Sequence, residues 1–507
     1  MTQNEALAIL EHGVSTLLTG AAGTGKTHLL NQFISRSKAR GKHVAVTATT
    51  GLAATHLGGT TIHAWSGIGI QDELPSSFGS HLSKQRREIL NKADILIIDE
   101  ISMLHDFRLD IINQALQQAR ETEEFFGGMQ VVLCGDFFQL PPINRQDGRQ
   151  GGFITDSESW QTGVFEVCYL HEQHRHADDD TYSAILNGIR AGSLMRSQLD
   201  ALLAKADAAA ATEHLETSTR LLTTNVDVDE INRKKLHNLD GKVQEYRMET
   251  TGSKRYVEQL KRSCLASEVL ELKIGAHVMC IKNSPDKRYV NGSLGQVIDF
   301  DAETGYPVVK LNSGRRIEIK PESWELRDGD KKRAGLTQLP LRLAWAITVH
   351  KSQGMTLDAA HIDLSKAFVE GMGYVALSRV RKLEDLALVG INNMALRTSP
   401  TAREIDVSLR SASDSTLRNH SSVINKWEEA EKFRPQQKKS NPSKSTWPEK
   451  IAKMRKEYPN AYRPWKSADD KKLLALHKKG TKTAELTKLF GRHPGSINAR
   501  LKKLLEE

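Results

Sequence analysis

The first 170 residues contain four short hydrophobic runs, each of which ends in polar residues or glycine. The runs are "STLLTG" (15–20), "HVAVTA" (43–48), "ADILIID" (93–99) and "MQVVLCGD" (129–136). Strands that helices cover on both faces carry continuous rather than alternating apolar residues. A segment with helical spacing, "HLLNQFISRSKARG" (28–41), follows the first run and stops at a glycine. The pattern predicts an α/β domain built on a parallel sheet, with its functional groups where the strands end.

Two later segments predict further sheet structure. "LRLAWAITVHKSQGMTL" (341–357) begins as an apolar strand and turns polar at its end. Residues 272–326 alternate between apolar and polar positions and contain several glycine turns, which predicts a small β-barrel insertion. Such an insertion either closes over a nucleic acid or is a structural element, because a fold alone fixes no function.

The composition changes in the last 100 residues. From about 403 to 460 the chain is polar and basic, with "RPQQKKSNPSKS" (434–445) as its clearest linker segment. Apolar spacing then predicts three helices, near 468–479, 482–490 and 494–505. They would form a helix-turn-helix-like module at 461–507. This module either binds DNA, with Arg492 and Arg500 facing the phosphates or the groove, or docks a protein.

The positive charge is concentrated in the same region. The 507-residue chain has a formal net charge of +9. Residues 432–507 carry 21 Lys/Arg and 7 Asp/Glu, a net charge of +14, which leaves 50 basic and 55 acidic residues, a net charge of −5, in residues 1–431. A basic segment indicates either an anionic partner, with nucleic acid as the leading candidate, or a solubilising tail.

Several classes of protein are excluded. No apolar run approaches the roughly 18 residues that a membrane span needs, so we expect no membrane partner. The N-terminus lacks the layout of a secretion signal. The four cysteines form no CxxC pair, so neither a zinc site nor a disulfide framework is indicated. We expect a cytoplasmic protein, associated with the nucleoid if it is bacterial.

The first hydrophobic run leads into a phosphate-binding motif. "GAAGTGKT" (20–27) matches G-x-x-x-x-G-K-[ST] and lies between a strand and a helix, as this motif requires. Lys26 would reach the β- and γ-phosphates of ATP, and Thr27 would be a ligand of Mg²⁺. The predicted ATP-binding residues of the motif are Gly20, Ala21, Ala22, Gly23, Thr24, Gly25, Lys26 and Thr27.

Two further strand ends carry groups suited to ATP hydrolysis. Asp99 and Glu100 end a buried run, where acids are costly unless a metal or a reacting water uses them. Asp99 would hold Mg²⁺ and Glu100 would activate the attacking water. Gln139, in "GDFFQLPP" (135–142), would reach the γ-phosphate from the next strand end, and the two prolines would pass its movement onward.

Threonine, serine, lysine, histidine and tryptophan side chains near strand ends predict contacts to a polynucleotide. Hydroxyl and basic groups suit phosphate oxygens, and aromatic rings can stack on bases. Trp65 is equally consistent with core packing. The candidate DNA-binding residues are Thr47, Thr50, His63 and Trp65 in the front domain and Thr348, His350, Lys351 and Ser352 in the back half.

Together these motifs resemble the superfamily 1B helicases and, within them, the PIF (petite integration frequency) family of DNA helicases. The matching segments occur in family order and include "GAAGTGKT", "VTATTGLAA", "IIDEISML", "CGDFFQLPP", "TTNVDVDEIN", "AWAITVHKSQGMTLD" and "GYVALSRVRKLEDL". The resemblance implies two RecA-like P-loop lobes with parallel sheets and an SH3-like insertion. The implied domains are 1–170 for the first lobe, 171–265 with 336–402 for the second, 266–335 for the insertion, 403–460 for a linker and 461–507 for the C-terminal module.

The resemblance also implies roles for individual residues. The nucleotide-cleft residues that it adds are Gln3, which would read adenine, Gln353 and Gly354. Arg175 and Arg379 resemble the two arginines that reach the γ-phosphate, although the family usually has glutamine after the first of them and this chain has His176. The predicted catalytic residues are therefore Lys26, Glu100, Gln139, Arg175 and Arg379.

The function that the resemblance implies is a monomeric, ATP-hydrolysing DNA helicase with Mg²⁺ as cofactor. It would move 5′-to-3′ on single-stranded DNA and unwind duplexes or junctions in repair, recombination, replication or telomere maintenance. Two alternatives are a RecD-like translocase subunit of a larger complex and an ATP-switched DNA-binding regulator. The length of the segment at 46–69 argues against the first, and the motifs after residue 340 argue against the second, because a switch needs no second lobe.

Overall fold

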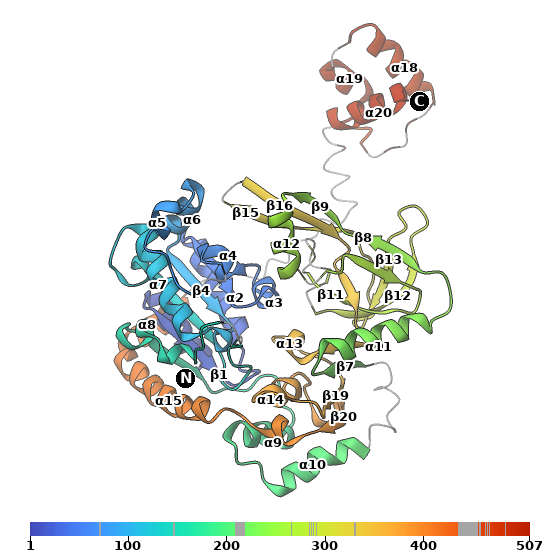
Figure 1. The fold of residues 1–507 in the computed structure, drawn as a ribbon. Helices are drawn as coiled ribbons and strands as arrows, with labels where there is room; N and C mark the ends of the chain where they lie inside the picture. The colour runs from blue at the N-terminus through green and yellow to red at the C-terminus, as the bar shows by residue number, and fades with distance from the viewer. Residues whose placement is uncertain are drawn as a thin grey trace. The chain divides into compact units, whose positions relative to one another are not determined.

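The computed structural model contains two compact units, Met1–Glu429 and Ala430–Glu507 (Figure 1). Among the described residues, the first unit holds two parallel sheets and a group of antiparallel strands, and the second holds a cluster of helices near the C-terminus. No helix in the described part of the chain has the length and apolar character needed to cross a bilayer. The structure describes residues 1–69, 72–144, 148–207, 218–264, 266–282, 284, 286, 288–289, 292–328, 331–433, 455, 458–461, 463, 465, 467–481 and 483–506.

Six parallel strands form the first sheet, in the order β3-β2-β4-β5-β1-β6. The strands are β1 Thr16–Gly20, β2 Val44–Ala48, β3 Thr60–Thr61, β4 Ile95–Asp99, β5 Gln130–Gly135 and β6 Glu166–Leu170. All four predicted strands are present, and β3 and β6 extend the sheet at its two edges. The carboxyl ends of β1, β4 and β5 therefore meet side by side, which positions the site.

Helices cover both faces of this sheet. On β1, Leu17 packs into the core that includes α7, whereas Leu18 packs into the core beneath α1 and α2, because successive strand residues point to opposite faces. Burial on both faces explains why the strands are continuous apolar runs. The helices of this lobe are α1 Gln3–His12, α2 Lys26–Ala39, α3 Gly51–His56, α4 Ile62–Ser66, α5 Phe78–His81, α6 Lys84–Lys92, α7 Asp106–Arg120 and α8 Glu158–Thr162.

A second parallel sheet has the strand order β18-β7-β19-β20. Its strands are β7 Thr219–Leu222, β18 Ala346–Thr348, β19 Ala360–Leu364 and β20 Leu386–Ile391. The helices around it are α9 Asp180–Ala191, α10 Arg196–Asp207, α11 Asn225–His237, α13 Val349–Ser352 and α14 Met372–Leu377. The first unit therefore has the α/β core of two RecA-like lobes that the sequence predicts.

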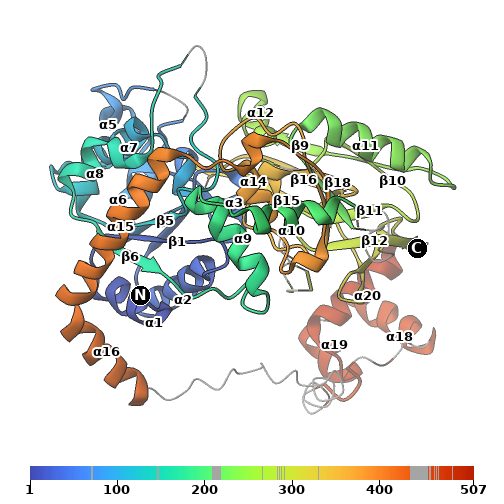
Figure 2. The ribbon, with the colours of Figure 1, turned by 90° about the horizontal axis from the view of Figure 1, so that it is seen from below.

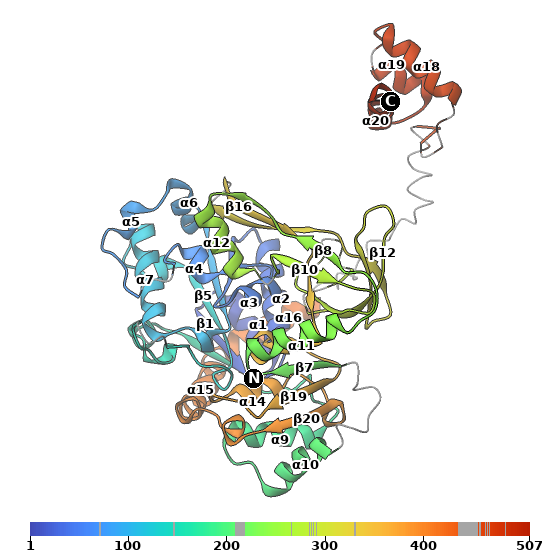
Figure 3. The ribbon, with the colours of Figure 1, turned by 45° about the vertical axis from the view of Figure 1, so that its right-hand side comes forward.

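Antiparallel strands between β7 and β18 form a separate group, drawn in green and yellow in Figure 3. They pair in the orders β14-β13-β12-β11-β17, β15-β16-β9 and β10-β8. The elements are β8 Gln244–Arg247, β9 Glu249–Gly252, α12 Lys254–Ser263, β10 Val269–Leu272, β11 His277–Cys280, β12 Leu294–Phe300, β13 Pro307–Leu311, β14 Arg316–Glu318, β15 Glu322–Asp328, β16 Lys331–Gln338 and β17 Leu341–Leu343. The paired strands extend beyond the predicted insertion at 266–335, because β9 precedes it and β17 follows it.

The predicted linker at 403–460 begins with two helices, α15 Pro400–Asn419 and α16 Ser421–Phe433. α15 packs along β6, the edge strand of the first sheet (Figure 2). An edge strand leaves backbone N–H groups unpaired. Here the amide of Tyr169 donates to Ser413 Oγ at 3.2 Å and the amide of Val167 donates to Thr416 Oγ1 at 3.1 Å, both in buried surroundings. The linker prediction is wrong for this part, because its polar side chains cap a sheet edge.

The second unit contains the three predicted helices, α18 Ser467–Lys478, α19 Thr483–Phe490 and α20 Pro494–Glu506. Their shared core consists of Leu473, Leu486, Phe490, Ile497 and Leu501, with Trp465 packed against it. In the rest of the predicted linker, residues 434–454, 456 and 457 lie outside the described residues.

Removing the hydroxyls that cap β6 should destabilise the first unit. In a Ser413→Ala/Thr416→Val variant, two buried amides lose their acceptors at about 1–3 kcal/mol each, so the urea midpoint followed by circular dichroism should fall. Ser411→Ala, on the exposed side of the same helix, is the matched control and should keep the wild-type midpoint. A double variant with an unchanged midpoint would contradict the role of these hydroxyls.

Candidate nucleotide site and nucleic-acid interface

The phosphate-binding loop connects β1 to α2. Its glycines Gly20, Gly23 and Gly25 have φ angles of 143°, 92° and 83°, which other residues rarely adopt. A Cβ at Gly20 would lie 2.6 Å from the carbonyl oxygen of Leu170, so the loop could not pass β6 with a larger residue. Lys26, the first residue of α2, donates from Nζ to the Gly20 carbonyl at 2.8 Å. The lysine ammonium therefore lies against the loop that would surround a phosphate.

Some residues of the motif hold the loop in place through hydrogen bonds within the protein. The buried Thr24 side chain donates to the Ala21 carbonyl at 2.9 Å, and the Ala22 amide donates to the Tyr374 hydroxyl at 2.9 Å. Gln3, on α1, donates from Nε2 to the Thr24 carbonyl at 3.1 Å. The Ala22 amide, which the motif predicts to face phosphate, is thus engaged by the second lobe.

Asp99 and Glu100 follow β4 at the same edge of the sheet. The backbone amide of Glu100 donates to Asp99 Oδ1 at 2.9 Å. Burial raises the pKa of Asp99 above its ordinary value, although this hydrogen bond and Lys26 oppose the shift. Burial and the charge of Asp99 raise the pKa of Glu100 to about 7, with Lys26 and Arg379 opposing. A carboxyl group with this pKa can accept a proton near neutral pH.

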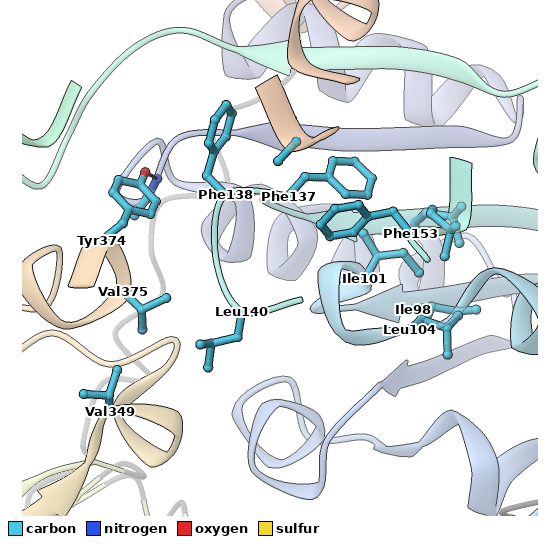
Figure 4. Close-up of a cluster of buried hydrophobic side chains, with 14 of the residues drawn as sticks. Ile98, Ile101, Leu104, Phe137, Phe138, Leu140, Phe153, Val349, Tyr374 and Val375 are labelled. Atoms are coloured by element: carbon cyan, nitrogen blue, oxygen red, sulfur yellow. Dashed lines mark hydrogen bonds between the residues drawn. The ribbon is translucent and has the colours of Figure 1, made fainter. Parts of the chain in front are cut away.

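Gln139 lies on a tight turn after β5. The Gln139 amide donates to the Asp136 carbonyl at 3.0 Å, and the Phe138 amide donates to Asp136 Oδ1 at 3.2 Å. Phe138 and its neighbour Phe137 are buried and anchor the turn (Figure 4). Among the described residues, the side-chain oxygen of Gln139 is buried without a hydrogen-bond partner, which costs free energy unless another state supplies one.

The second lobe faces these groups. Gln353 donates from Nε2 to Glu100 Oε2 at 2.8 Å. Arg175 donates from Nη1 to the Ser378 carbonyl at 2.8 Å, and burial together with Arg379 lowers its pKa to about 9. The buried Arg379 donates from Nε to the carbonyl of Val375 at 2.7 Å and from Nη1 to those of Ser352 and Met355 at 3.3 and 3.2 Å.

The departure from the family pattern at His176 has a structural explanation. His176 is buried, and its Nε2 donates to the Val380 carbonyl at 3.0 Å. Because a carbonyl only accepts, this contact fixes the proton on Nε2. The histidine therefore ties the segment carrying Arg175 to the segment carrying Arg379.

One cavity of about 340 Å³ joins the two lobes. The residues lining it are Ala22, Gly23, Gly25, Lys26, Thr27, Asp99, Glu100, Gly135, Gln139, His174, Arg175, Gly354, Thr356, Arg379 and Arg381. The lining has four lysine or arginine residues and two acids, so it favours a polyanion. The sequence patterns did not indicate Gly135, His174, Thr356 and Arg381, although each lies within four residues of a predicted residue. The predicted residues Gln3, Gly20, Ala21, Thr24 and Gln353 adjoin the cavity without lining it.

Two predicted DNA contacts of the first lobe are wrong. Thr47 is fully buried and donates to the Ile97 carbonyl at 2.6 Å inside the sheet. Trp65 is 8% exposed and belongs to the core of the lobe. The pattern could not separate a strand-end threonine facing solvent from one facing the neighbouring strand.

Thr50 and His63 instead line a surface cavity of about 320 Å³. Burial and the charge of Arg108 lower the pKa of His63 to about 4, so the ring is neutral near pH 7. The other residues lining this cavity are Thr49, Asp72, Met103, His105, Phe107, Arg108, Ile143, Gly148 and Arg149. Aromatic, hydroxyl and guanidinium groups on one surface are the kinds of group that bind single-stranded nucleic acid. Most were missed, because they come from the start of α7 and the loop after the prolines.

The predicted DNA contacts of the second lobe also include residues that are buried or engaged inside the protein. Ser352 is fully buried and donates to the Val349 carbonyl at 2.8 Å, and Thr348 caps α13 by accepting from the Lys351 amide at 3.3 Å. Both predictions of direct DNA contact are therefore wrong for this structure. His350 and Lys351 are only partly buried, and Lys351 donates from Nζ to Asn225 Oδ1 at 2.9 Å.

The two arginines predicted to contact DNA in the second unit are engaged internally. Arg492 is 5% exposed, donates to the Arg463 carbonyl at 2.7 Å and lies 4.2 Å from the centroid of the Trp465 ring. Arg500 donates through two nitrogens to Asp470 at 2.8 and 2.7 Å. The first contacts join the turn between α19 and α20 to the segment before α18, and the second joins α18 to α20. The prediction is therefore wrong for Arg492, and the structure places Arg500 in an ion pair.

A P-loop in one parallel-sheet lobe, faced by arginine and glutamine side chains from a second, defines a two-lobed P-loop ATPase. The chain belongs to the PIF1-like helicase family. Residues 4–198 match the family described as "PIF1-like helicase". Residues 255–300, within the antiparallel group, match the family described as "DNA helicase Pif1, 2B domain".

Named relatives agree with this assignment. The chain is 41% identical over 468 residues to the ATP-dependent DNA helicase Pif1 of Psychrobacter sp., a match that covers 80% of this chain and 70% of the relative. It is 36% identical over 414 residues to human ATP-dependent DNA helicase PIF1, covering 80% of this chain and 63% of the human protein.

Solved structures show the same fold. The Pif1 helicase of Candida albicans is 34% identical, with a TM-score of 0.67 over 81% of this chain and 98% of that one. Bacteroides sp. Pif1 in complex with ADP-AlF4 is 31% identical, with a TM-score of 0.69 over 81% and 97%. Bacteroides Pif1 has also been solved bound to single-stranded DNA, with a TM-score of 0.61 and 31% identity over 82% of this chain and 97% of that one.

Because Trp65 packs in the core, Trp65→Phe should lower stability and spare DNA binding. Losing part of a buried aromatic ring leaves a cavity that costs about 1–3 kcal/mol, measured as a lower urea midpoint. Affinity for a fluorescein-labelled oligothymidylate, measured by anisotropy, should stay within about twofold of wild type, because no base stacks on a buried ring. Arg108→Ala is the comparison and should weaken binding. A loss of affinity in Trp65→Phe as large as in Arg108→Ala would contradict the core assignment.

Proposed function

We propose that this chain is an ATP-dependent DNA helicase that moves on single-stranded DNA and separates duplexes. The observation that carries the proposal is the shared cavity. Lys26, Glu100 and Gln139 of one lobe face Arg175 and Arg379 across it. A nucleotide bound there is held by both lobes, so hydrolysis changes how the lobes attract each other. The names of the relatives and the Bacteroides structures with ADP-AlF4 and single-stranded DNA support this proposal.

The cavity supports a specific division of chemical roles. A phosphate would compete for the Lys26 ammonium with the neutral Gly20 carbonyl and prevail, because charge-assisted hydrogen bonds are stronger. Glu100 would accept the proton of the attacking water, and Gln353 would orient its carboxylate. Arg175 and Arg379 would stabilise the charge that develops on the transferred phosphoryl group.

Mg²⁺ fits the same cavity. The hydroxyl of Thr27 and the carboxylate of Asp99 both line it, and burial makes the negative charge of Asp99 unfavourable, a cost that a cation would offset. The described residues contain no group of three or more His, Cys, Asp and Glu suited to a metal. Phosphate oxygens and water would therefore complete the coordination shell, as is usual for this ion.

Gln139 is the group we assign to sensing the γ-phosphate. Its buried, unpartnered oxygen would gain a hydrogen bond from an ordered water beside the phosphate. The prolines Pro141 and Pro142 follow after one residue, and Ile143 beyond them lines the cavity of His63 and Arg108. A shift at Gln139 thus has a short, stiff path to the proposed DNA surface.

The single-stranded DNA would cross the surface that Thr50, His63 and Arg108 line and continue to His350 and Lys351 of the second lobe. We assign the antiparallel group the role of an SH3-like element that closes over the strand. The second unit would act as a helix-turn-helix-like DNA-binding module. Its exposed lysines, rather than Arg492 and Arg500, would contact phosphates; they include Lys471, Lys472, Lys478, Lys479 and Lys488. The motor would act as a monomer on junctions that arise in repair, recombination or replication.

Direction of movement is tested with two partial duplexes, one with a 5′ single-stranded tail and one with a 3′ tail. Unwinding should require ATP and occur only on the 5′-tailed substrate. Lys26→Ala should abolish it, because the variant loses the charge that holds the phosphates. Unwinding of only the 3′-tailed substrate would contradict the polarity. ATPase that DNA stimulates without unwinding either substrate would favour a translocase subunit.

Deleting residues 434–507 separates a motor from an ATP-switched regulator. The deletion keeps α15 and α16 and removes a segment with 20 Lys/Arg and 7 Asp/Glu, a net charge of +13. A motor should retain DNA-stimulated ATPase within about twofold, because the nucleotide cavity lies in the first unit. Loss of the stimulation, measured by phosphate release at saturating DNA, would favour a regulator in which the C-terminal module sets the site.

A further inference from the structure

A buried polar network lies behind the nucleotide cavity and joins the two lobes. Asp136, at the end of β5, accepts from Arg190 Nη1 at 2.7 Å through Oδ1 and from the Tyr374 hydroxyl at 3.2 Å through Oδ2. Arg190 belongs to α9 and Tyr374 to α14, both in the second lobe. Tyr374 and Asp136 are at most 2% exposed and Arg190 is 6% exposed. None of these residues is assigned a role in the proposed hydrolysis.

This network reaches the phosphate-binding loop through one hydroxyl. The Tyr374 hydroxyl donates its proton to Asp136 and accepts from the Ala22 amide at 2.9 Å and from Arg190 Nη1 at 3.2 Å. A tyrosine hydroxyl has one proton and two lone pairs, so all of its capacity is used. Movement of the loop at Ala22 would therefore break a bond that Tyr374 cannot replace.

The same network reaches Gln139. Asp136 Oδ1, which accepts from Arg190, also accepts from the Phe138 amide, and the Asp136 carbonyl accepts from the Gln139 amide. The carboxylate thereby holds the turn that presents Gln139. Figure 4 shows the Phe138 and Tyr374 side chains near each other where the turn approaches α14.

The start of α14 packs closely against the other side of this turn. Gly371, which caps α14, has a φ angle of 82°. A Cβ at this position would lie 2.5 Å from the carbonyl oxygen of Gln139 and 2.6 Å from that of Phe138. Only glycine permits this approach. The turn is thus held between the backbone of α14 and the carboxylate of Asp136, and it cannot shift without moving α14.

The opposite charges of Asp136 and Arg190 stabilise this arrangement of the turn and α14. Burial alone would lower the pKa of Arg190, but the carboxylate of Asp136 and the neighbouring Tyr374, Tyr169 and Asp406 raise it well above its ordinary value. Asp406, on α15, accepts from Arg190 Nη2 at 3.0 Å. A buried ion pair that loses one partner leaves an uncompensated charge, so the network favours one geometry strongly over its alternatives.

We propose that Tyr374, Asp136 and Arg190 are positioning residues that set Gln139 and the Ala22 amide relative to each other. When the second lobe closes, the Tyr374 hydroxyl moves the γ-phosphate sensor and the phosphate-binding loop together. This inference rests on the proposed ATPase function, because Gln139 is its point of action.

The test is Tyr374→Phe, with Tyr169→Phe as the matched control. Tyr169 is also a buried tyrosine of this network, and its hydroxyl contacts Arg190 at 3.0 Å and Asp406 at 2.7 Å. Its hydroxyl makes no described hydrogen bond to Asp136 or Ala22, so the control removes a hydroxyl that contacts Arg190 but neither the turn nor the phosphate-binding loop. ATPase is measured with and without DNA, and the thermal midpoints are compared.

Tyr374→Phe should lower kcat of the ATPase about tenfold and change KM for ATP by less than about twofold, because a misplaced sensor slows the reaction while the phosphates stay bound. Tyr169→Phe should leave kcat near wild type. In a Gln139→Ala background, Tyr374→Phe should have little further effect, because it acts through Gln139. If Tyr374→Phe folds poorly, Asp136→Asn/Arg190→Gln, which removes both charges of the buried pair together, should reproduce the loss of kcat.

Equal kcat values for Tyr374→Phe and wild type, or equal losses in both tyrosine variants, would overturn the proposal and leave a purely structural network. A full additional loss in the Gln139→Ala background would also overturn it. The ATPase measurement does not require strand separation. A protein that hydrolyses ATP but unwinds nothing would contradict the helicase function and still decide this comparison.

Discussion

Charges of both signs can be buried in the nucleotide cleft because each lobe supplies what the other needs. Burial raises the pKa of Glu100 to about 7 and lowers that of Arg379, so each charge would be unfavourable in the cleft without the other. Lys26 and Arg379 oppose the shift at Glu100, and Arg379 comes from the second lobe. The electrostatics of the cleft are therefore complete only when the lobes meet. A bound polyphosphate changes that balance directly, which gives ATP a means of setting the distance between the lobes.

A second pair of opposite charges, Asp136 and Arg190, joins the two lobes on the other side of the phosphate-binding loop. Here the chain itself crosses between lobes, because β6 leads through residues 171–179 to α9 and β20 leads back to α15. Thr398, just before α15, donates to the Arg190 carbonyl at 3.1 Å. The lobes are thus joined both covalently and electrostatically at this point. Movement between them is most restricted there, and the cleft is the part left to respond to nucleotide.

The sequence predicted the parts whose chemistry requires a local pattern. A phosphate loop needs its glycines and lysine at fixed spacing, and buried strands need continuous apolar runs, so Lys26, Asp99 and Gln139 were found together with four strands of the first sheet. It failed where a side chain's partner comes from a distant segment. Ser413 and Thr416 read as linker residues because nothing nearby indicates that they cap β6. Hydroxyl groups suit a sheet edge and a solvated loop equally well, and only the tertiary fold decides between them.

Direct DNA contacts were the least predictable feature, for a related reason. Thr47 and Trp65 have side chains that suit phosphates and bases, but hydrogen bonding to Ile97 and packing in the core occupy them. Arg108 and Arg149 lie at the cavity of His63 because α7 and the loop after Pro142 approach each other in space. That loop is continuous with Gln139. The segment from Gln139 to Ile143 therefore joins the nucleotide cavity to the proposed DNA surface. Pro141 and Pro142 give it the stiffness that such a connection needs.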